Sequence, residues 1–248
     1  MNAMKLGRTV EVSESTVVRF ASQLGYDGYP GMRRALQEMI RNRLTSVQRI
    51  EVARDTVDSR DILASVLTGD MEKIRTTLDE VDKAAFEAAV NALLEGKRIF
   101  ILGLRAAAAL SGFMGFYLSL TREHVRIVNE SYVNEVFEQI LNIGPGDVLF
   151  AISFPRYSRR TVKAMRYARD RGATMIGLTD GAASPIAELA DIRLFARSDL
   201  VSYLDSLVAP FSLIHALLVA MGQRAEAEIS ETFERLERIW TEYDVFEK

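Results

Sequence analysis

Short apolar runs alternate with helical stretches through the second half of the chain. The runs cover residues 98–103, 125–129, 147–153, 174–180 and 191–196, and helical periodicity covers 106–120, 132–141, 159–171 and 184–189. Runs that are apolar throughout are typical of strands buried on both faces, as in a parallel sheet. The alternation therefore predicts an α/β fold, a doubly wound parallel sheet with right-handed crossovers.

Helical patterns flank this region on both sides. The expected helices cover 14–23, 32–44, 82–94, 202–222 and 225–243, while 45–81 is helical and charged with no strand pattern. The last helix is amphipathic and acidic, and it either covers the core or meets a partner subunit. We therefore divide the chain into a helical head (1–45), a helical linker (46–80), an α/β domain (81–224) and a C-terminal amphipathic helix (225–248).

Composition excludes several kinds of site. The chain has no cysteine and only two histidines, so disulfides and thiolate metal sites are excluded, and we expect no metal and no cofactor. The longest apolar stretch, 206–221, is interrupted by Pro210 and His215, which favours a core helix with a buried histidine over a membrane span. The first residues lack an apolar signal core. These features predict a cytoplasmic protein without a membrane partner.

The net charge of −3 is unevenly distributed. Residues 1–50 sum to +4 and the remainder to −7. A basic head on an acidic body is typical of a protein that binds a polyanion through its head. A solvated helix face explains the same charges equally well.

The segment EVSESTVVRFASQLGYDGYPGMRRAL, from residue 11, has the pattern of a helix that reads DNA. Ser13 is a natural N-cap, and small polar side chains at Ser15 and Thr16 are followed by Arg19. In helix-turn-helix proteins the N-terminal end of the second helix enters the major groove, where short hydroxyl side chains reach base edges or phosphates. We therefore assign DNA binding to Ser13, Ser15, Thr16 and Arg19. An ordinary amphipathic surface helix is the alternative.

The same segment closely resembles the recognition-helix signature of the RpiR (MurR/RpiR) family of bacterial transcriptional regulators. Members of that family join a helix-turn-helix domain to a SIS (sugar isomerase) domain, and the region from about residue 96 to 222 is similar to SIS domains. Family members usually have a first helix and a longer lead before this motif, whereas only MNAMKLGRTVEV precedes it here. We therefore expect the first helix to be missing and Val17, Val18 and Phe20 to be exposed on one side.

The loop GLRAAAALS, residues 103–111, is the first candidate for ligand binding. SIS domains have a G-x-G-x-S loop after their first strand, and Gly103 matches its first glycine. Arg105 stands at the second glycine and Ala107 at the serine. The resemblance implies an anion site in which a guanidinium replaces a hydroxyl. A helix start with an arginine that points into solvent is equally consistent.

The second loop, SFPRYSRRT, covers residues 153–161. The sugar-phosphate loop of SIS domains usually reads S-x-S-G-x-T/S; here Ser153 and Ser158 keep the outer hydroxyls, while Pro155 and Arg156 replace the middle pair. Ser158 begins the next helix, whose free N–H groups favour an anion. This form resembles a variant found among RpiR-type proteins, and we interpret it as a specialised pocket. The following Arg159 and Arg160 are interpreted as solvated.

The third loop, residues 179–191, matches the family pattern T-D-x-x-x-S-P-[LI]-A well. Thr179 and Ser184 are candidate ligand contacts, although Ser184 also caps the helix opened by Pro185. Turn and cap chemistry alone explains both residues at least as well. Glu135 is a possible acid or base, but nothing in the sequence places it near the loops.

These features lead to one favoured function and two alternatives. The favoured function is a non-enzymatic transcriptional regulator that binds double-stranded DNA and senses a small anionic metabolite, either a sugar phosphate or a sugar acid. By analogy with paired half-sites we expect a homo-oligomer, either a dimer or a tetramer. The alternatives are a sugar-phosphate isomerase, for which no convincing general base is present, and a sensing and dimerising protein without DNA binding.

Overall fold

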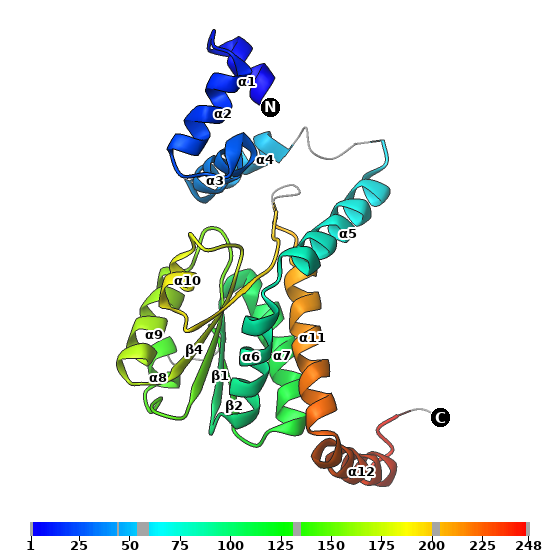
Figure 1. Ribbon diagram of the computed structural model, residues 1–248. Coiled ribbons are helices and arrows are strands. Elements are labelled where there is room, and N and C mark those ends of the chain that lie inside the picture. Colours follow the sequence, from blue (N-terminus) through cyan, green and yellow to red (C-terminus); the bar gives the residue numbers. More distant parts are fainter. Residues whose placement is uncertain (1, 44, 54–59, 131–134, 200–203, 247–248) are drawn as a thin grey trace. The chain divides into compact units, whose positions relative to one another are not determined.

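The structure is a computed structural model that describes residues 2–43, 45–53, 60–130, 135–199 and 204–246 (Figure 1). Contacts divide the chain into two compact units, Met1–Val52 and Ala53–Lys248. The first unit is helical. The second contains a five-stranded sheet with helices on both of its faces.

The N-terminal unit contains the helices α1 (Ala3–Thr9), α2 (Glu14–Gln23), α3 (Gly28–Arg43) and α4 (Ser46–Ala53). The side chain of Ser13 caps α2 by accepting a hydrogen bond from the Thr16 N–H, as the sequence predicts. Gly25 follows that helix with φ +84°, a conformation that favours glycine. Helices α1 and α2 are joined by the four residues 10–13 and pack against each other.

Helix α1 is not predicted from the sequence. Gly7, which lowers helix propensity, lies in its middle, but a Cβ at this position would lie 2.7 Å from the Val12 carbonyl oxygen. Glycine therefore lets the turn fold closely back onto the helix. Ala3, Leu6 and Val17 belong to one small apolar cluster, and only 5% of Val17 is exposed. The predicted exposure of Val17 is wrong for this reason, whereas Val18 and Phe20 are exposed as predicted.

The second unit begins with α5 (Ile62–Glu80) and α6 (Lys83–Glu95), and it then alternates strands and helices. Its further elements are β1 (Ile99–Gly103), a 3-10 turn (Arg105–Ala107), α7 (Ala108–Thr121), β2 (Val125–Val128), α8 (Val136–Gln139), β3 (Val148–Ile152), α9 (Arg159–Asp170), β4 (Thr174–Thr179), α10 (Pro185–Leu189), β5 (Ile192–Phe195), α11 (Val208–Arg224) and α12 (Glu226–Glu242). All strand pairs are parallel, in the order β2-β1-β3-β4-β5. The predicted doubly wound α/β fold is confirmed.

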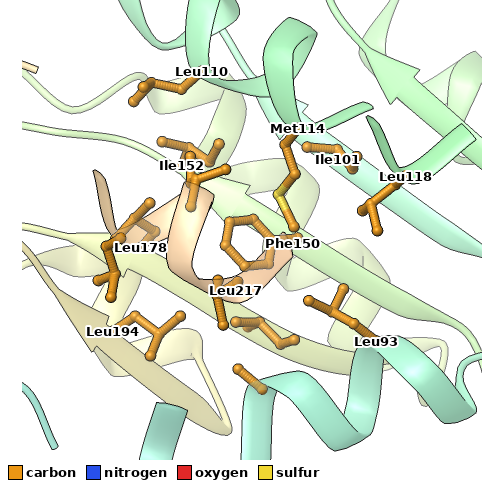
Figure 2. Close-up of a cluster of buried hydrophobic side chains, with 14 of the residues drawn as sticks. Leu93, Ile101, Leu110, Met114, Leu118, Phe150, Ile152, Leu178, Leu194 and Leu217 are labelled. Atoms are coloured by element: carbon orange, nitrogen blue, oxygen red, sulfur yellow. The ribbon is translucent and has the colours of Figure 1, made fainter. Parts of the chain in front are cut away.

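Alternate residues of the strands contribute to two separate cores. Helices α6, α7 and α11 cover one face, where Phe150 and Ile101 are fully buried, and α8, α9 and α10 cover the other (Figure 1). Figure 2 shows Phe150 of β3 surrounded by Met114, Leu217 and Leu93 from the three helices of the first face. Burial on both faces explains why the central strands β1, β3 and β4 are almost entirely apolar in sequence.

Several element boundaries differ from the prediction; helix α3, for example, begins at Gly28 and not at residue 32. Helix α8 begins at Val136 and α11 at Val208, later than the predicted 132 and 202, and residues 132–134 and 202–203 lie outside the described ranges. Helix α5, part of the predicted linker, packs against α11 and is part of the second unit. Within the described ranges no single helix is long and apolar enough to cross a bilayer; only α11 and α12 together, across a 97° bend, meet that standard of length and composition.

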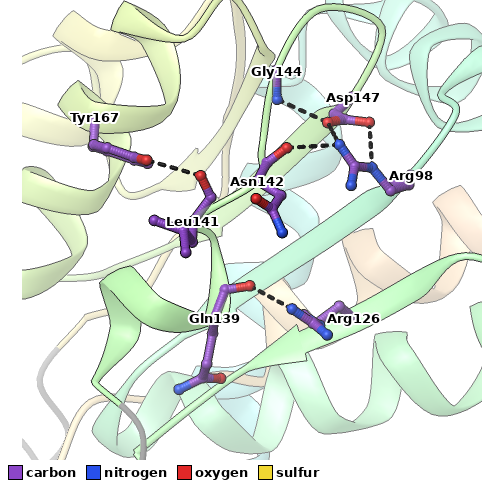
Figure 3. Close-up of polar contacts among 8 residues, drawn as sticks. All are labelled: Arg98, Arg126, Gln139, Leu141, Asn142, Gly144, Asp147 and Tyr167. Carbon is purple, nitrogen blue, oxygen red and sulfur yellow. Dashed lines mark hydrogen bonds and ion pairs between the residues drawn. The ribbon is translucent and has the colours of Figure 1, made fainter.

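An ion pair between the partly exposed Arg98 and the buried Asp147 holds the amino ends of β1 and β3 together (Figure 3). Arg98 donates to both carboxylate oxygens of Asp147, at 2.9 and 2.6 Å, and also to the Asn142 carbonyl, while the Gly144 N–H donates to the same carboxylate. Burial alone would raise the pKa of Asp147, but these hydrogen bonds and the charges of Arg98 and Lys97 outweigh it and hold the pKa below its usual value. The hydrogen bond to Asp147 in turn raises the pKa of Arg98.

Candidate functional site

The strand order reverses between β1 and β3, and the candidate loops begin there. Chain order runs from β1 outward to β2 on one side and through β3 to β5 on the other. In open α/β sheets ligands bind beyond the carboxyl ends of the strands at such a switch point. Gly103 pairs with Ile152 in the register, so the loops that follow β1 and β3 leave the sheet side by side.

The loop after β1 turns sharply at Arg105. This residue is exposed and has a φ of +57°, in the left-handed region where side chains other than glycine are strained. A Cβ at Gly103 would lie 2.5 Å from the Ala107 carbonyl oxygen and 2.8 Å from Ser111 Oγ, so only glycine fits there. Gly103 therefore permits the close turn, and Arg105 is the residue of this loop that presents a charged group at the surface.

The loop after β3 also contains an exposed arginine with a left-handed backbone. Arg156 is exposed and has a φ of +66°. Ser153 is only 5% exposed, and its Oγ accepts a hydrogen bond from the Ser158 N–H at 3.3 Å. The Ser158 hydroxyl caps α9 by accepting from the Thr161 N–H, as expected for the start of that helix. The arginine and the free N–H groups of the first turn of α9 both favour an anion.

The two candidate residues of the loop after β4 are buried, although Ala182 and Ala183 between them are exposed. Thr179 is 0% and Ser184 1% exposed, and their hydroxyls lie 2.8 Å apart. Ser184 also caps α10 by accepting from the Ile186 N–H. Thr179 donates to Asp180, whose carboxylate also accepts from the Tyr157 hydroxyl at 2.7 Å. Thr179 and Ser184 therefore stabilise the turn, and the loop contacts the neighbouring loop after β3 through Asp180.

Two buried hydroxyls at this end of the sheet have no hydrogen-bond partner. Among the described residues, the buried side-chain oxygens without a partner are Thr161 Oγ1, in the first turn of α9, and Ser198 Oγ, three residues after β5. Buried polar groups are nearly always paired, so unpaired ones are typical of functional sites. Sequence reasoning missed both residues, although Thr161 ends the SFPRYSRRT motif.

The charged residues that follow Ser158, and Glu135, lie on the exposed surface. Arg159 and Arg160 are exposed, as predicted, and Arg160 lies 3.6 and 3.7 Å from the carboxylates of Glu130 and Glu135. Glu135 is therefore held in an exposed ion pair. Among the described residues no three His, Asp or Glu side chains gather closely enough to hold a metal ion.

The prediction for His215 is wrong. Its side chain is exposed and lines an apolar groove of about 290 Å³ between α7, α11 and α12, with Phe113 and Phe233 among the lining residues. Helix α11 is apolar on nearly all sides, and for that reason its sequence does not indicate which side faces the sheet.

The four residues assigned to DNA binding lie together at the start of α2 and on its first turns. Ser13, Ser15, Thr16 and Arg19 are all exposed. The Ser13 hydroxyl lies 2.9 Å from Ser15 Oγ and 2.7 Å from Thr16 Oγ1, so the three hydroxyls form one cluster at the helix N-terminus. Such a cluster offers donors and acceptors to a groove edge or a phosphate.

Comparison with known proteins identifies the second unit and finds relatives that extend over nearly the whole chain. Residues 92–220 match the family described as SIS domain. An uncharacterized HTH-type transcriptional regulator of Caldanaerobacter subterraneus subsp. tengcongensis is 22% identical over 245 residues, which are 96% of this chain and 85% of that protein.

Solved structures agree with this match. The sugar isomerase domain of an RpiR transcription factor from Sphaerobacter thermophilus is 28% identical, with a TM-score of 0.68 over 72% of this chain and 99% of that chain. The Vibrio vulnificus NanR protein complexed with ManNAc-6P has the same fold, with 18% identity and a TM-score of 0.62 over 97% of this chain and 85% of that chain. The resemblance to RpiR-type proteins is thereby confirmed, and the chain belongs to the SIS domain family.

Proposed function

We propose that this chain is a transcriptional regulator whose N-terminal unit binds duplex DNA and whose SIS domain binds a small phosphorylated sugar or a related anionic sugar derivative. The observation that supports the sensing half most directly is the pair of exposed arginines at the switch point. A left-handed residue other than glycine costs about 1–2 kcal/mol. Arg105 and Arg156 both adopt this conformation on neighbouring loops, where the family pattern has glycine. Strain of this kind persists where function requires the side chain.

Relatives support the same class of effector. The NanR structure contains a phosphorylated sugar derivative, ManNAc-6P. In this chain the guanidinium groups and the first turn of α9 supply the donors that a phosphate or a carboxylate needs. We infer that the effector is an anion bound by the loops after β1 and β3, with Gly103, Arg105, Ser153, Arg156 and Ser158 in the site and Thr179 and Ser184 supporting it from beneath.

The DNA-binding half rests on the exposed hydroxyl cluster and on Arg19 of α2. A gel-shift assay with promoter fragments from around the gene tests it. We expect Arg19→Ala to weaken binding to all fragments and to lower the salt dependence of log K by about one unit, because one phosphate contact is lost. Arg238→Ala is the matched control, since Arg238 is an exposed arginine of α12. Failure of the wild-type chain to bind any fragment would contradict a regulator and favour a sensing protein without DNA binding.

The isomerase alternative requires a positioned general base. Asp180, the carboxylate that contacts the candidate loops, already accepts hydrogen bonds from Tyr157 and Thr179. We therefore expect no interconversion when the chain is incubated with aldose and ketose phosphates and followed by NMR. Turnover that is lost in the Asp180→Asn variant would instead establish an enzyme.

A further inference from the structure

The candidate ligand loops are connected to helix α5 by a series of hydrogen bonds joined through adjacent main-chain atoms. Helix α5 (Ile62–Glu80) is the first helix of the α/β unit, which begins at Ala53 where the N-terminal unit ends. Its partners in this series lie more than 100 residues later in the sequence, in the segment after β5. A series of this kind offers a physical connection between a ligand site and the segment that leads to the DNA-binding unit.

The series begins beside Arg156. The hydroxyl of Tyr157, the next residue, donates to Asp180 Oδ1 at 2.7 Å, and Thr179 Oγ1 donates to the same oxygen at 3.1 Å. Thr179 is the last residue of β4 and is fully buried. The loop after β3 is therefore joined to the end of β4 through a carboxylate acceptor, which makes stronger hydrogen bonds than a neutral one.

The series then crosses from β4 to the segment after β5. The Ala196 N–H donates to the Thr179 carbonyl oxygen at 2.9 Å, and Ala196 is 2% exposed. Two residues further, Ser198 is 1% exposed, and its hydroxyl has no partner. The segment is thus held on one side by β4, and it contains a buried hydroxyl without a partner.

The last step reaches α5. The Arg197 N–H donates to Thr77 Oγ1 at 2.9 Å, and Nη2 of its guanidinium donates to both carboxylate oxygens of Glu80, the last residue of the helix. Thr77 is 7% exposed, so its hydrogen bond is shielded from water, whereas the Glu80 side chain is 45% exposed. Arg197 therefore joins the segment after β5 to the last turn of α5 through its main chain and its side chain.

A second connection holds the same helix one to two turns earlier. Ser206 Oγ donates to Asp70 Oδ1 at 2.6 Å, and the Lys73 ammonium lies 3.5 Å from the same oxygen while it donates to the Gly69 carbonyl. Lys73 is 9% and Ser206 7% exposed. The two connections attach α5 to the segment after β5 between positions 70 and 80. We therefore expect the helix and this segment to move together.

We propose that this series, Tyr157–Asp180–Thr179–Ala196–Arg197–Thr77, is the route by which occupancy of the anion site changes the position of α5 and thereby the DNA-binding unit. The regulatory role rests on the function proposed above, whereas the mechanical connection itself does not. A contiguous series in a structure is a hypothesis of coupling, and coupling has to be measured.

Hydrogen–deuterium exchange of the full-length chain, without any ligand, tests the connection. Asp180→Asn removes the charged acceptor at the ligand end, and Tyr157→Phe removes its donor without changing the charge. The matched controls are Asp244→Asn and Tyr243→Phe, since both residues are exposed after α12. We expect each variant at the ligand end to speed exchange of the Arg197 amide and of amides near Thr77 roughly fivefold, the effect of losing about 1 kcal/mol of hydrogen bonding. The controls should leave these amides unchanged.

Faster exchange confined to residues 153–184 in both variants would overturn the connection, because the effect would then stop at the end of β4. Faster exchange that reaches Thr77 would establish it, whatever the effector is. A separate experiment tests the regulatory role. It measures the DNA affinity of the wild-type chain with and without ManNAc-6P or 6-phosphogluconate as probes. If the wild-type chain does not bind DNA under any condition, the proposed function is contradicted. The exchange result would still test the connection between the loops and α5.

Discussion

The two ends of the sheet differ in how their polar groups are paired and in backbone strain. At the amino end, Arg98 and Asp147 are paired with each other, Gly144 also donates to the carboxylate, and Arg98 also donates to the Asn142 carbonyl (Figure 3). At the carboxyl end, two arginines have left-handed backbones, and the hydroxyls of Thr161 and Ser198 are buried without partners. Satisfied networks stabilise a fold, whereas strained backbones cluster at functional sites. We therefore assign stability to the amino end of the sheet and the proposed ligand site to its carboxyl end.

The largest effect should come from breaking the amino end. Asp147→Ala leaves the Arg98 guanidinium and the Gly144 N–H without their acceptor, and we expect a loss of about 3 kcal/mol in the free energy of unfolding, as for other broken ion pairs with one buried partner. Urea denaturation measures it, with Asp170→Ala, at an exposed position in α9, as the control. The stabilisation added by an effector should stay unchanged. A loss of effector binding in the folded variant would contradict the division between the two ends.

The same ion pair predicts a pH dependence. The pKa of Asp147 is lowered in the folded state, so its contribution to stability is complete above the unfolded pKa of about 4 and is lost as the pH falls through the lower folded pKa. The stability difference between the wild-type chain and Asp147→Asn should therefore be constant above about pH 5 and shrink below about pH 4. Urea denaturation from pH 6 to pH 2.5 measures this difference. A difference that grows on acidification would show that the carboxylate is not stabilised by its partners.

A smaller effect of opposite sign is expected at the carboxyl end. Arg156→Gly removes the cost of a φ of +66°, so the variant should be more stable by about 1 kcal/mol. It should also lose effector affinity about tenfold or more, because a charge-assisted contact disappears. Arg166→Gly, within α9, is the matched control and should destabilise the chain by about 1 kcal/mol. Destabilisation by Arg156→Gly would show that this arginine contributes to the fold instead of the site.

Much of the fold follows from the sequence because the three central strands are buried on both faces. The edge strands β2 and β5 each carry an exposed arginine, Arg126 and Arg193, and yet each of the five predicted strands lies within one or two residues of the observed one. The caps at Ser13, Ser158 and Ser184 are also predicted correctly, since a hydroxyl before a helix has a clear local role. These features depend on a few neighbouring residues only.

Other features depend on contacts that the sequence does not contain. Helix α1 is not predicted because Gly7 lowers the helix propensity of this segment. The glycine is needed there because the Val12 carbonyl approaches it closely. The face of α11 that is buried, and with it the exposure of His215, is set by packing on a helix without a distinct polar side. The left-handed conformations of Arg105 and Arg156 are also unpredictable from residue type, since arginine has no preference for that region.

The most direct measurement is a thermal-shift screen of sugar phosphates and sugar acids on the full-length chain and on its Arg156→Ala and Ser153→Ala variants. An effector at 100 times its Kd adds about 2.7 kcal/mol, or roughly 5–10 °C for a domain of this size. We predict that at least one phosphorylated or carboxylated sugar gives such a shift in the wild-type chain, and that the shift is lost in the variants. An equal shift in all three chains, or no shift from any anionic sugar, would contradict an anion site at the carboxyl ends of β1 and β3.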